Sequence, residues 1–335
     1  MYQTPDMSLW KGRVDSRENR ACFRWHQAIE LISLEGQGAQ HGFAAPTLAF
    51  LGFASDEGVR RNRGREGAYQ GCYALRHALA NLAVHFEEDQ LHLVDAGTVL
   101  GDRNLHQAQR QFGEKVTALL QRQWLPVLMG GGHEISYGHF MGLESWLHQS
   151  GKRFGILNFD AHWDLRNDPP DGIGSSGTPF RQIAERCQEL HIPFHYLVAG
   201  IQESANTRWL FDKAESLGAT SIPARKFSMA HRQEVLDQLQ GFLEKVDCVM
   251  MTVDLDGFAA AYAPGVSAPN ATGFLPDVVM ECFETVMAHQ KLLSFDMAEL
   301  NPRYDLDGRT ARLAAALIYE LSRLYRQYPC QVLNA

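Results

Sequence analysis

Short apolar runs alternate with longer amphipathic stretches along most of this chain. The runs predict strands at residues 47–54, 91–95, 125–129, 154–160, 195–200, 248–254 and 291–297. The amphipathic stretches at 105–123, 276–290 and 309–327 predict helices. Apolar strands that alternate with helices are typical of a parallel sheet covered on both faces. We therefore expect an α/β fold of three layers, αβα, around a central and mostly parallel sheet.

Length and charge limit the organisation and the partners. The 335 residues contain no internal repeat, low-complexity tract or long linker, so we expect one domain over 1–335, with 1–45 as an N-terminal extension packed on it. The net charge of −8 argues against nucleic acid and anionic membranes as partners. No apolar run approaches the roughly 20 residues that span a bilayer. The six cysteines form no CxxC motif and are expected as reduced thiols of a cytoplasmic protein.

Polar residues collect where four of the predicted strands end. In parallel sheets, ligands bind at the carboxyl ends of the strands, so these residues should lie near one another. The four ends read GGGHE with His133, DAHWD with Asp160, His162 and Asp164, DLDG with Asp254 and Asp256, and DMAELNP with Glu299.

The spacing and the charges of these residues predict a metal site. Side chains alternate along an extended segment, so Asp160, His162 and Asp164 should share one side, as should Asp254 and Asp256. Carboxylates and imidazoles without thiolates suit Mn²⁺ better than structural zinc. The set, with His133, carries four carboxylates, and two divalent ions would neutralise them where one ion would leave two negative charges partly buried.

Each motif also has a simpler explanation. A DxHxD pattern arises by chance, DLD after a strand is often a polar turn, and GGGH could cradle a phosphate. The glycine run lacks the Lys-Ser/Thr of a P-loop and the spacing of a dinucleotide fingerprint. The joint occurrence of the motifs at successive strand ends favours the metal site.

In this order, GGGHE, NFDAHWD, TVDLDGF and FDMAELNP resemble the ureohydrolases, the family of arginase and agmatinase, from about residue 51 to residue 317. The resemblance implies an αβα fold and two Mn²⁺ per subunit. It implies His133 and Asp164 on one ion, His162 and Asp256 on the other, and Asp160 and Asp254 as bridges. It further implies that a hydroxide between the ions attacks an amidine-type carbon.

The resemblance also implies two catalytic carboxylates. Asp164 is expected to accept the hydroxide proton and pass it to the leaving amine. Glu299 is expected to pair with the guanidinium or amidinium of a small-molecule substrate. The alternative for Glu299 is a surface residue before Asn301-Pro302. Family members often form trimers or hexamers, so a homo-oligomer is one expectation.

Departures from the family pattern bear on the substrate. Gly132 stands where Asp is common, and Ser176 stands where arginase and agmatinase place a proton-shuttling His. Arg166 offers a charge-assisted contact to a substrate carboxylate, or is a structural residue paired to Asp168 or Asp171. Arg61 or Arg63 is a candidate for a second carboxylate.

These departures favour N-formimidoyl-L-glutamate, hydrolysed to L-glutamate and formamide in histidine degradation. Alternatives are agmatinase activity, release of urea from a carboxylated guanidine, and an inactive binding protein.

Overall fold

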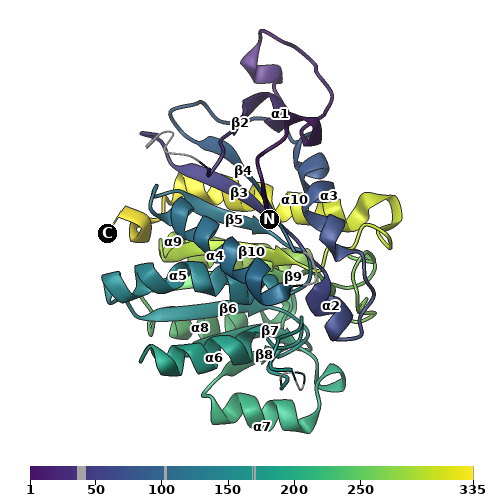
Figure 1. Ribbon diagram of the computed structural model, residues 1–335, viewed down its shortest axis with the longest axis vertical. Coiled ribbons are helices and arrows are strands. Elements are labelled where there is room, and N and C mark those ends of the chain that lie inside the picture. The colour runs from purple at the N-terminus through teal and green to yellow at the C-terminus, as the bar shows by residue number, and fades with distance from the viewer. Residues whose placement is uncertain (36–42, 102–103, 168, 170, 335) are drawn as a thin grey trace.

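The computed structural model describes residues 1–35, 43–101, 104–167, 169 and 171–334. Its described strands are β1 (Tyr2–Gln3), β2 (Ile29–Leu31), β3 (Thr47–Ala54), β4 (His92–Leu100), β5 (Leu125–Met129), β6 (Phe154–Phe159), β7 (His195–Ile201), β8 (Thr220–Pro223), β9 (Cys248–Asp254) and β10 (Leu292–Ala298). They form one sheet in the order β1-β4-β3-β5-β10-β9-β6-β7-β8, with β2 beside β4 (Figure 1). Among the pairings of these strands, only that of β1 with β4 is antiparallel.

The described α-helices are α1 (Trp25–Ala28), α2 (Glu57–Arg61), α3 (Gly71–Leu79), α4 (Leu105–Leu120), α5 (Ile135–Ser150), α6 (Pro179–Glu189), α7 (Arg208–Ser216), α8 (Arg232–Leu243), α9 (Pro276–Ala288) and α10 (Arg309–Gln327). One layer contains α4, α5 and α6, and the opposite layer contains α3, α10, α9 and α8 (Figure 1). The predicted three-layer αβα fold with a mostly parallel sheet is confirmed. None of the described helices is long and apolar enough to cross a membrane.

The central strands are apolar because helices cover both of their faces. Every residue of β3, β5, β6, β9 and β10 is buried. Alternation therefore cannot mark a solvent face here, as expected for a doubly covered parallel sheet. The same burial makes any polar residue inside these strands a sign of a specific partner.

The N-terminal segment joins the edge of the sheet. Tyr2 pairs with Val99 across β1 and β4, and Ile29 pairs with Leu93 across β2 and β4. The sequence predicted none of the short edge strands β1, β2 and β8, which contain two to four residues each. The single-domain organisation stays a prediction, and the structure adds that residues before 45 contribute two strands to the main sheet.

Candidate metal centre

Three glycines bring the turn after β5 against its neighbours and so place His133. A Cβ on Gly131 would collide with the carbonyl oxygen of Ser55, and a Cβ on Gly132 would collide with the carboxylate of Glu134. The Gly131 carbonyl accepts the Glu299 N–H at 2.8 Å. The glycine run is therefore required by close packing between the ends of β3, β5 and β10.

The segment after β6 turns, which corrects the expectation of an extended chain. Asp160 Oδ1 accepts the backbone N–H of His162 at 2.7 Å, an Asx-type contact that curls the chain. Asp164 has a φ of 48°, in the left-handed region, and Tyr196 holds the turn through a 3.1 Å bond from its hydroxyl to the Trp163 carbonyl. The three side chains meet because the turn gathers them rather than because alternate residues share a face.

The end of β9 repeats this arrangement. Asp254 Oδ1 accepts the N–H of Asp256 at 2.8 Å and starts the 3-10 turn Leu255–Gly257. The predicted strand 248–254 is reproduced, but Asp256 lies in the turn and not in an extended segment. Both acidic motifs are thus local turns in which the first carboxylate orders the backbone that carries the next polar residue.

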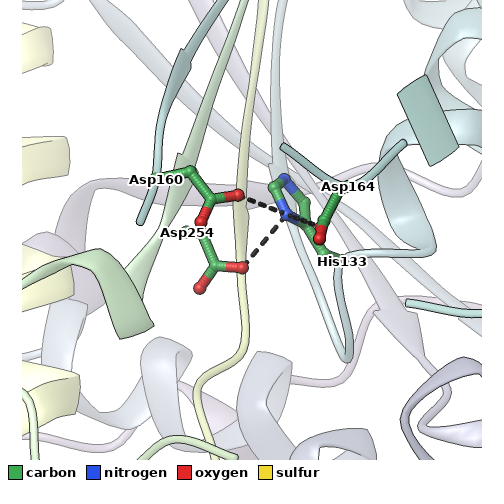
Figure 2. A group of neighbouring side chains, drawn as sticks. All are labelled: His133, Asp160, Asp164 and Asp254. Atoms are coloured by element: carbon green, nitrogen blue, oxygen red, sulfur yellow. Dashed lines mark ion pairs between the residues drawn. The ribbon is translucent and has the colours of Figure 1, made fainter. Parts of the chain in front are cut away.

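The first group of possible metal ligands surrounds His133 (Figure 2). Its Nδ1 lies 3.3 Å from Asp160 Oδ2, 3.0 Å from Asp164 Oδ2 and 3.0 Å from Asp254 Oδ2. Nδ1 nevertheless forms no hydrogen bond of acceptable geometry with any of them. Three carboxylate oxygens and one imidazole nitrogen that converge without bonding to one another could serve as the donor set of a cation site.

The second group consists of Asp160, His162 and Asp256. His162 Nδ1 lies 3.3 Å from Asp160 Oδ1 and 3.5 Å from Asp256 Oδ1, and the latter oxygen is buried without a hydrogen bond. Asp160 belongs to both groups, one oxygen facing each imidazole, which is the position of a bridging ligand. Asp254 belongs to the first group alone, so its expected bridging role stays a prediction.

The electrostatics of the two groups favour positive charge beside the carboxylates. Burial opposes a charge on either imidazole, yet the surrounding carboxylates raise the pKa of His133 well above its usual value and that of His162 to about 12. Burial and the Asp254 charge raise the pKa of Asp256 well above its usual value. With only protons to balance the charge, the site would hold them tightly, and divalent ions can take their place.

A buried polar network behind His133 was missed by the sequence analysis. His133 Nε2 lies 3.0 Å from Thr252 Oγ1, which donates to Asp296 at 2.6 Å. Asp296 also lies 2.6 Å from Nδ1 of His139, whose Nε2 lies 2.6 Å from Ser294 Oγ. Because Thr252 donates to Asp296, its oxygen accepts from His133 Nε2–H, which leaves Nδ1 free to act as a ligand atom.

Glu299 lies at the same edge of the sheet, in a strained conformation with φ of 67°. Its Oε1 accepts the backbone N–H of His133 at 3.0 Å, and its Oε2 is buried without a partner. Glu299 lines a cavity of about 300 Å³ together with both imidazoles. The surface alternative for Glu299 is therefore wrong, since the side chain is buried and faces this cavity. Its role toward a substrate stays a prediction.

The same cavity is also lined by Arg63, Arg166 and Ser176. The suggestion that Arg61 clamps a carboxylate is not supported. Its guanidinium donates to Asp171 and to the carbonyls of residues 173 and 174. Asp171 is thus the partner of Arg61, and no bond joins it to Arg166. Asp168, the other suggested partner of Arg166, lies outside the described residues.

A larger hollow of about 1060 Å³ opens beside β7, β8 and α7. Neither group of metal-ligand candidates lines it. The smaller cavity contains both imidazoles and the buried carboxyl oxygens without partners, so the chemistry belongs there.

With this fold and donor set, the chain belongs to the arginase family, whose model matches residues 46–323. Formimidoylglutamase of Chromobacterium violaceum is 44% identical over 323 residues, which cover 96% of this chain and 99% of that protein. Formimidoylglutamase of Clostridium tetani is 38% identical and covers 96% of this chain and 95% of its own. Trypanosoma cruzi formiminoglutamase, solved with Mn²⁺, superposes with a TM-score of 0.74 at 26% identity, covering 84% of this chain and 94% of that one.

Proposed function

We propose that this chain is a formimidoylglutamase, a hydrolase that cleaves N-formimidoyl-L-glutamate to L-glutamate and formamide with two Mn²⁺ per subunit. The observation that carries the proposal is the cavity itself. Its floor contains His133, His162 and buried carboxylates, and its rim contains arginines. A substrate with one amidinium and two carboxylates fits that distribution of charge. Relatives named formimidoylglutamase, more than 40% identical over nearly the full chain, support the same reaction.

The residues present fit two divalent ions. His133 and Asp164 would hold one ion, His162 and Asp256 the other, with Asp160 and Asp254 between them. The orphaned Nδ1 of His133 and Oδ1 of Asp256 are donor atoms of the type that manganese accepts. Bound ions would lower the pKa of a water molecule and so supply a nucleophile at neutral pH.

Three protein groups would carry the remaining steps. The free Oε2 of Glu299 would accept a hydrogen bond from the substrate amidinium and orient its carbon. Asp164 would take a proton from the attacking water and return it to the glutamate nitrogen as the carbon–nitrogen bond breaks. Without bound ions, burial and the neighbouring Asp160 charge raise the pKa of Asp164. Arg166 and Ser176 would bind the substrate at the rim.

The proposal places the protein in histidine degradation and in the cytoplasm. All six cysteines are free, and five of them are buried, which is consistent with a reducing compartment.

The test is hydrolysis by manganese-loaded protein of N-formimidoyl-L-glutamate, L-arginine, agmatine and 4-guanidinobutyrate, with glutamate, formamide and urea measured as products. The proposal expects glutamate and formamide in equal amounts from the first compound and no turnover of the others. Release of urea from any of the guanidines, without turnover of N-formimidoyl-L-glutamate, would contradict the proposal and indicate another activity of the family.

A further inference from the structure

Two loops bring three polar side chains together at the rim of the cavity. Asn62, directly after α2, donates from Nδ2 to Ser176 Oγ at 3.1 Å. A Cβ on Gly177 would lie 2.7 Å from Arg166 Cδ and 3.2 Å from Asn62 Nδ2. Arg166 and Asn62 therefore approach the same point from opposite loops, and the absence of a side chain at Gly177 leaves room for both.

These side chains have more donors than acceptors. Because Ser176 accepts from Asn62, the serine keeps its own hydroxyl proton to donate, and the amide keeps its second N–H. The Arg166 guanidinium adds five N–H groups, and among the described residues it has no hydrogen-bond or ion-pair partner. A cluster of neutral and cationic donors at one point is satisfied by a carboxylate, whose two oxygens accept from several sides.

The charges around this point distinguish it from an ordinary arginine-rich surface. Arg60 is paired with Glu57, and Arg61 with Asp171. Arg63 and Arg65 line the cavity with Arg166, and no carboxylate of the described residues pairs with any of these three. Among the described residues, three arginines without a carboxylate partner thus lie together at the rim, above an acidic floor.

The two loops are also fixed to each other. The Arg61 guanidinium is only 12% exposed and binds Asp171, with further bonds to the carbonyls of residues 173 and 174. On the other side, Arg65 donates to the carbonyls of residues 266 and 267. Asn62 lies between these two anchors, so its amide is held in place before a ligand arrives.

We propose that Asn62 is a substrate-binding residue that determines specificity, and that it binds one carboxylate of the substrate jointly with Arg166 and the Ser176 hydroxyl. This inference rests on the proposed function and adds the residue that recognises the carboxylate. Gly177 acts as a positioning residue, since any side chain there displaces the guanidinium or the amide. The bound carboxylate receives hydrogen bonds from three side chains, while the amidine end reaches the floor.

The first test compares steady-state kinetics of Asn62→Asp, Asn62→Ala and Asn104→Asp. The aspartate variant places a negative charge against the carboxylate, so KM should rise about 10- to 100-fold while kcat changes far less. The alanine variant removes one donor to a charged acceptor, so KM should rise about tenfold. Asn104→Asp adds the same charge at the exposed N-terminus of α4, where aspartate also caps a helix, and should leave both constants unchanged.

The second test identifies the carboxylate with two analogues. N-formimidoyl-L-glutamine lacks the side-chain carboxylate, and 4-(formimidoylamino)butanoate lacks the α-carboxylate. The penalty of Asn62→Asp should persist for one analogue and fall to about twofold or less for the other. An equal penalty for all three compounds, or none, would overturn the inference, because a general loss of structure does not distinguish carboxylates.

A binding measurement keeps the inference separate from the proposed function. Calorimetric titration of manganese-loaded protein with L-glutamate reports on the rim without turnover, and Asn62→Asp should weaken this binding at least about tenfold. Unchanged affinity would overturn the role of Asn62 even if the wild-type protein hydrolyses N-formimidoyl-L-glutamate. Absence of that hydrolysis, with weakened glutamate binding in the variant, would reject the proposed function and retain the carboxylate site.

Discussion

Two buried acidic regions of this molecule are compensated in opposite ways. Asp95 in β4 is fully buried and receives a bidentate pair from Arg76, with both distances 2.8 Å. Trp10 Nε1 and the Gly97 N–H also donate to it, at 2.6 and 3.0 Å. The protein itself therefore satisfies this charge completely.

The carboxylates at the ends of β6 and β9 accept some hydrogen bonds, as Asp160 and Asp254 do from the backbone, but they lack a partner like Arg76. Among the described residues, no arginine or lysine is paired with Asp160, Asp164, Asp254 or Asp256. Their charged neighbours are the imidazoles of His133 and His162. His133 Nδ1 and Asp256 Oδ1 remain without a hydrogen bond. The difference teaches that burial of acid alone does not mark a functional site. The mark is buried acid that the fold leaves uncompensated.

The largest expected effect follows from removing a candidate metal ligand from the uncompensated region. Asp254→Ala should lower kcat/KM for N-formimidoyl-L-glutamate about a thousandfold or more, since metal-assisted activation of water is worth several kcal/mol. Bound manganese should fall below two equivalents per chain. Asp237→Ala, on the exposed face of α8, is the control and should retain both properties. Two tightly bound equivalents in the Asp254 variant would remove this residue from the site.

The same comparison predicts opposite effects on stability. Arg76→Met leaves Asp95 buried without its cation and should lower the free energy of unfolding by about 3–5 kcal/mol. Measured in chelator, Asp254→Ala should be neutral or stabilising, because it relieves repulsion among buried carboxylates. Urea denaturation of both variants measures the two changes. A loss in Asp254→Ala equal to that in Arg76→Met would show that the two regions are both structural.

Asp296 is intermediate between Asp95 and the carboxylates of the two groups. It is buried, and its hydrogen-bond partners are Thr252 and His139 rather than an arginine. Asp296→Asn should keep the shape and weaken the acceptor that orders Thr252 and hence His133. We expect manganese affinity to fall about 10- to 100-fold, the usual cost of losing such a supporting contact. Asp237→Asn is the control, because Asp237 is exposed on α8. Asn158→Asp is not suitable because Asn158 contacts Asp160. Unchanged affinity would limit Asp296 to a packing role.

The smallest effect is expected for a surface pair at the amino ends of β6 and β9, at the other end of these strands from the candidate metal centre. Arg153 donates to Asp247 at 2.7 and 3.0 Å, and this lowers the pKa of Asp247 to about 2. The folded pKa lies below the unfolded one, so the stabilisation is present above about pH 4 and is lost as pH falls through about 2. Asp247→Asn should cost far less than Arg76→Met, and 1 M salt should reduce the difference. A salt-independent loss would contradict this account.

The sequence singled out the six residues that converge in the two groups because each lies at the end of an apolar strand or in the turn that follows it. Apolar runs that end in Asp or His require no knowledge of distant contacts, and all six predicted ligands lie in the two groups. The predicted local geometry of these residues was wrong, because the alternation of side chains along a strand was assumed to continue past the strand ends. The backbone hydrogen bonds to Asp160 and Asp254 turn the chain there, and such turns depend on side-chain contacts that periodicity does not contain.

Other parts of the site depend on contacts between distant segments. Thr252 and Asp296 lie inside fully buried strands, where one polar residue in an apolar run gave no signal by itself. A search for the hydrogen-bond partner of Asp296, which lies in the apolar run of β10, could have found the network. Asn62 was overlooked among arginines, because its bond to Ser176 joins residues 114 positions apart. Helix α5 was missed because Gly138 and Gly142 interrupt its pattern, although they allow α4 to approach closely.

The most direct test of the central claim is the number of manganese ions bound per chain. Protein stripped with chelator would be titrated with Mn²⁺ by calorimetry, and the metal retained after gel filtration would be counted. The account predicts two equivalents per chain and a higher unfolding temperature, because two divalent ions neutralise four buried carboxylates. No bound manganese, or a single ion with the second group still holding its protons, would contradict it.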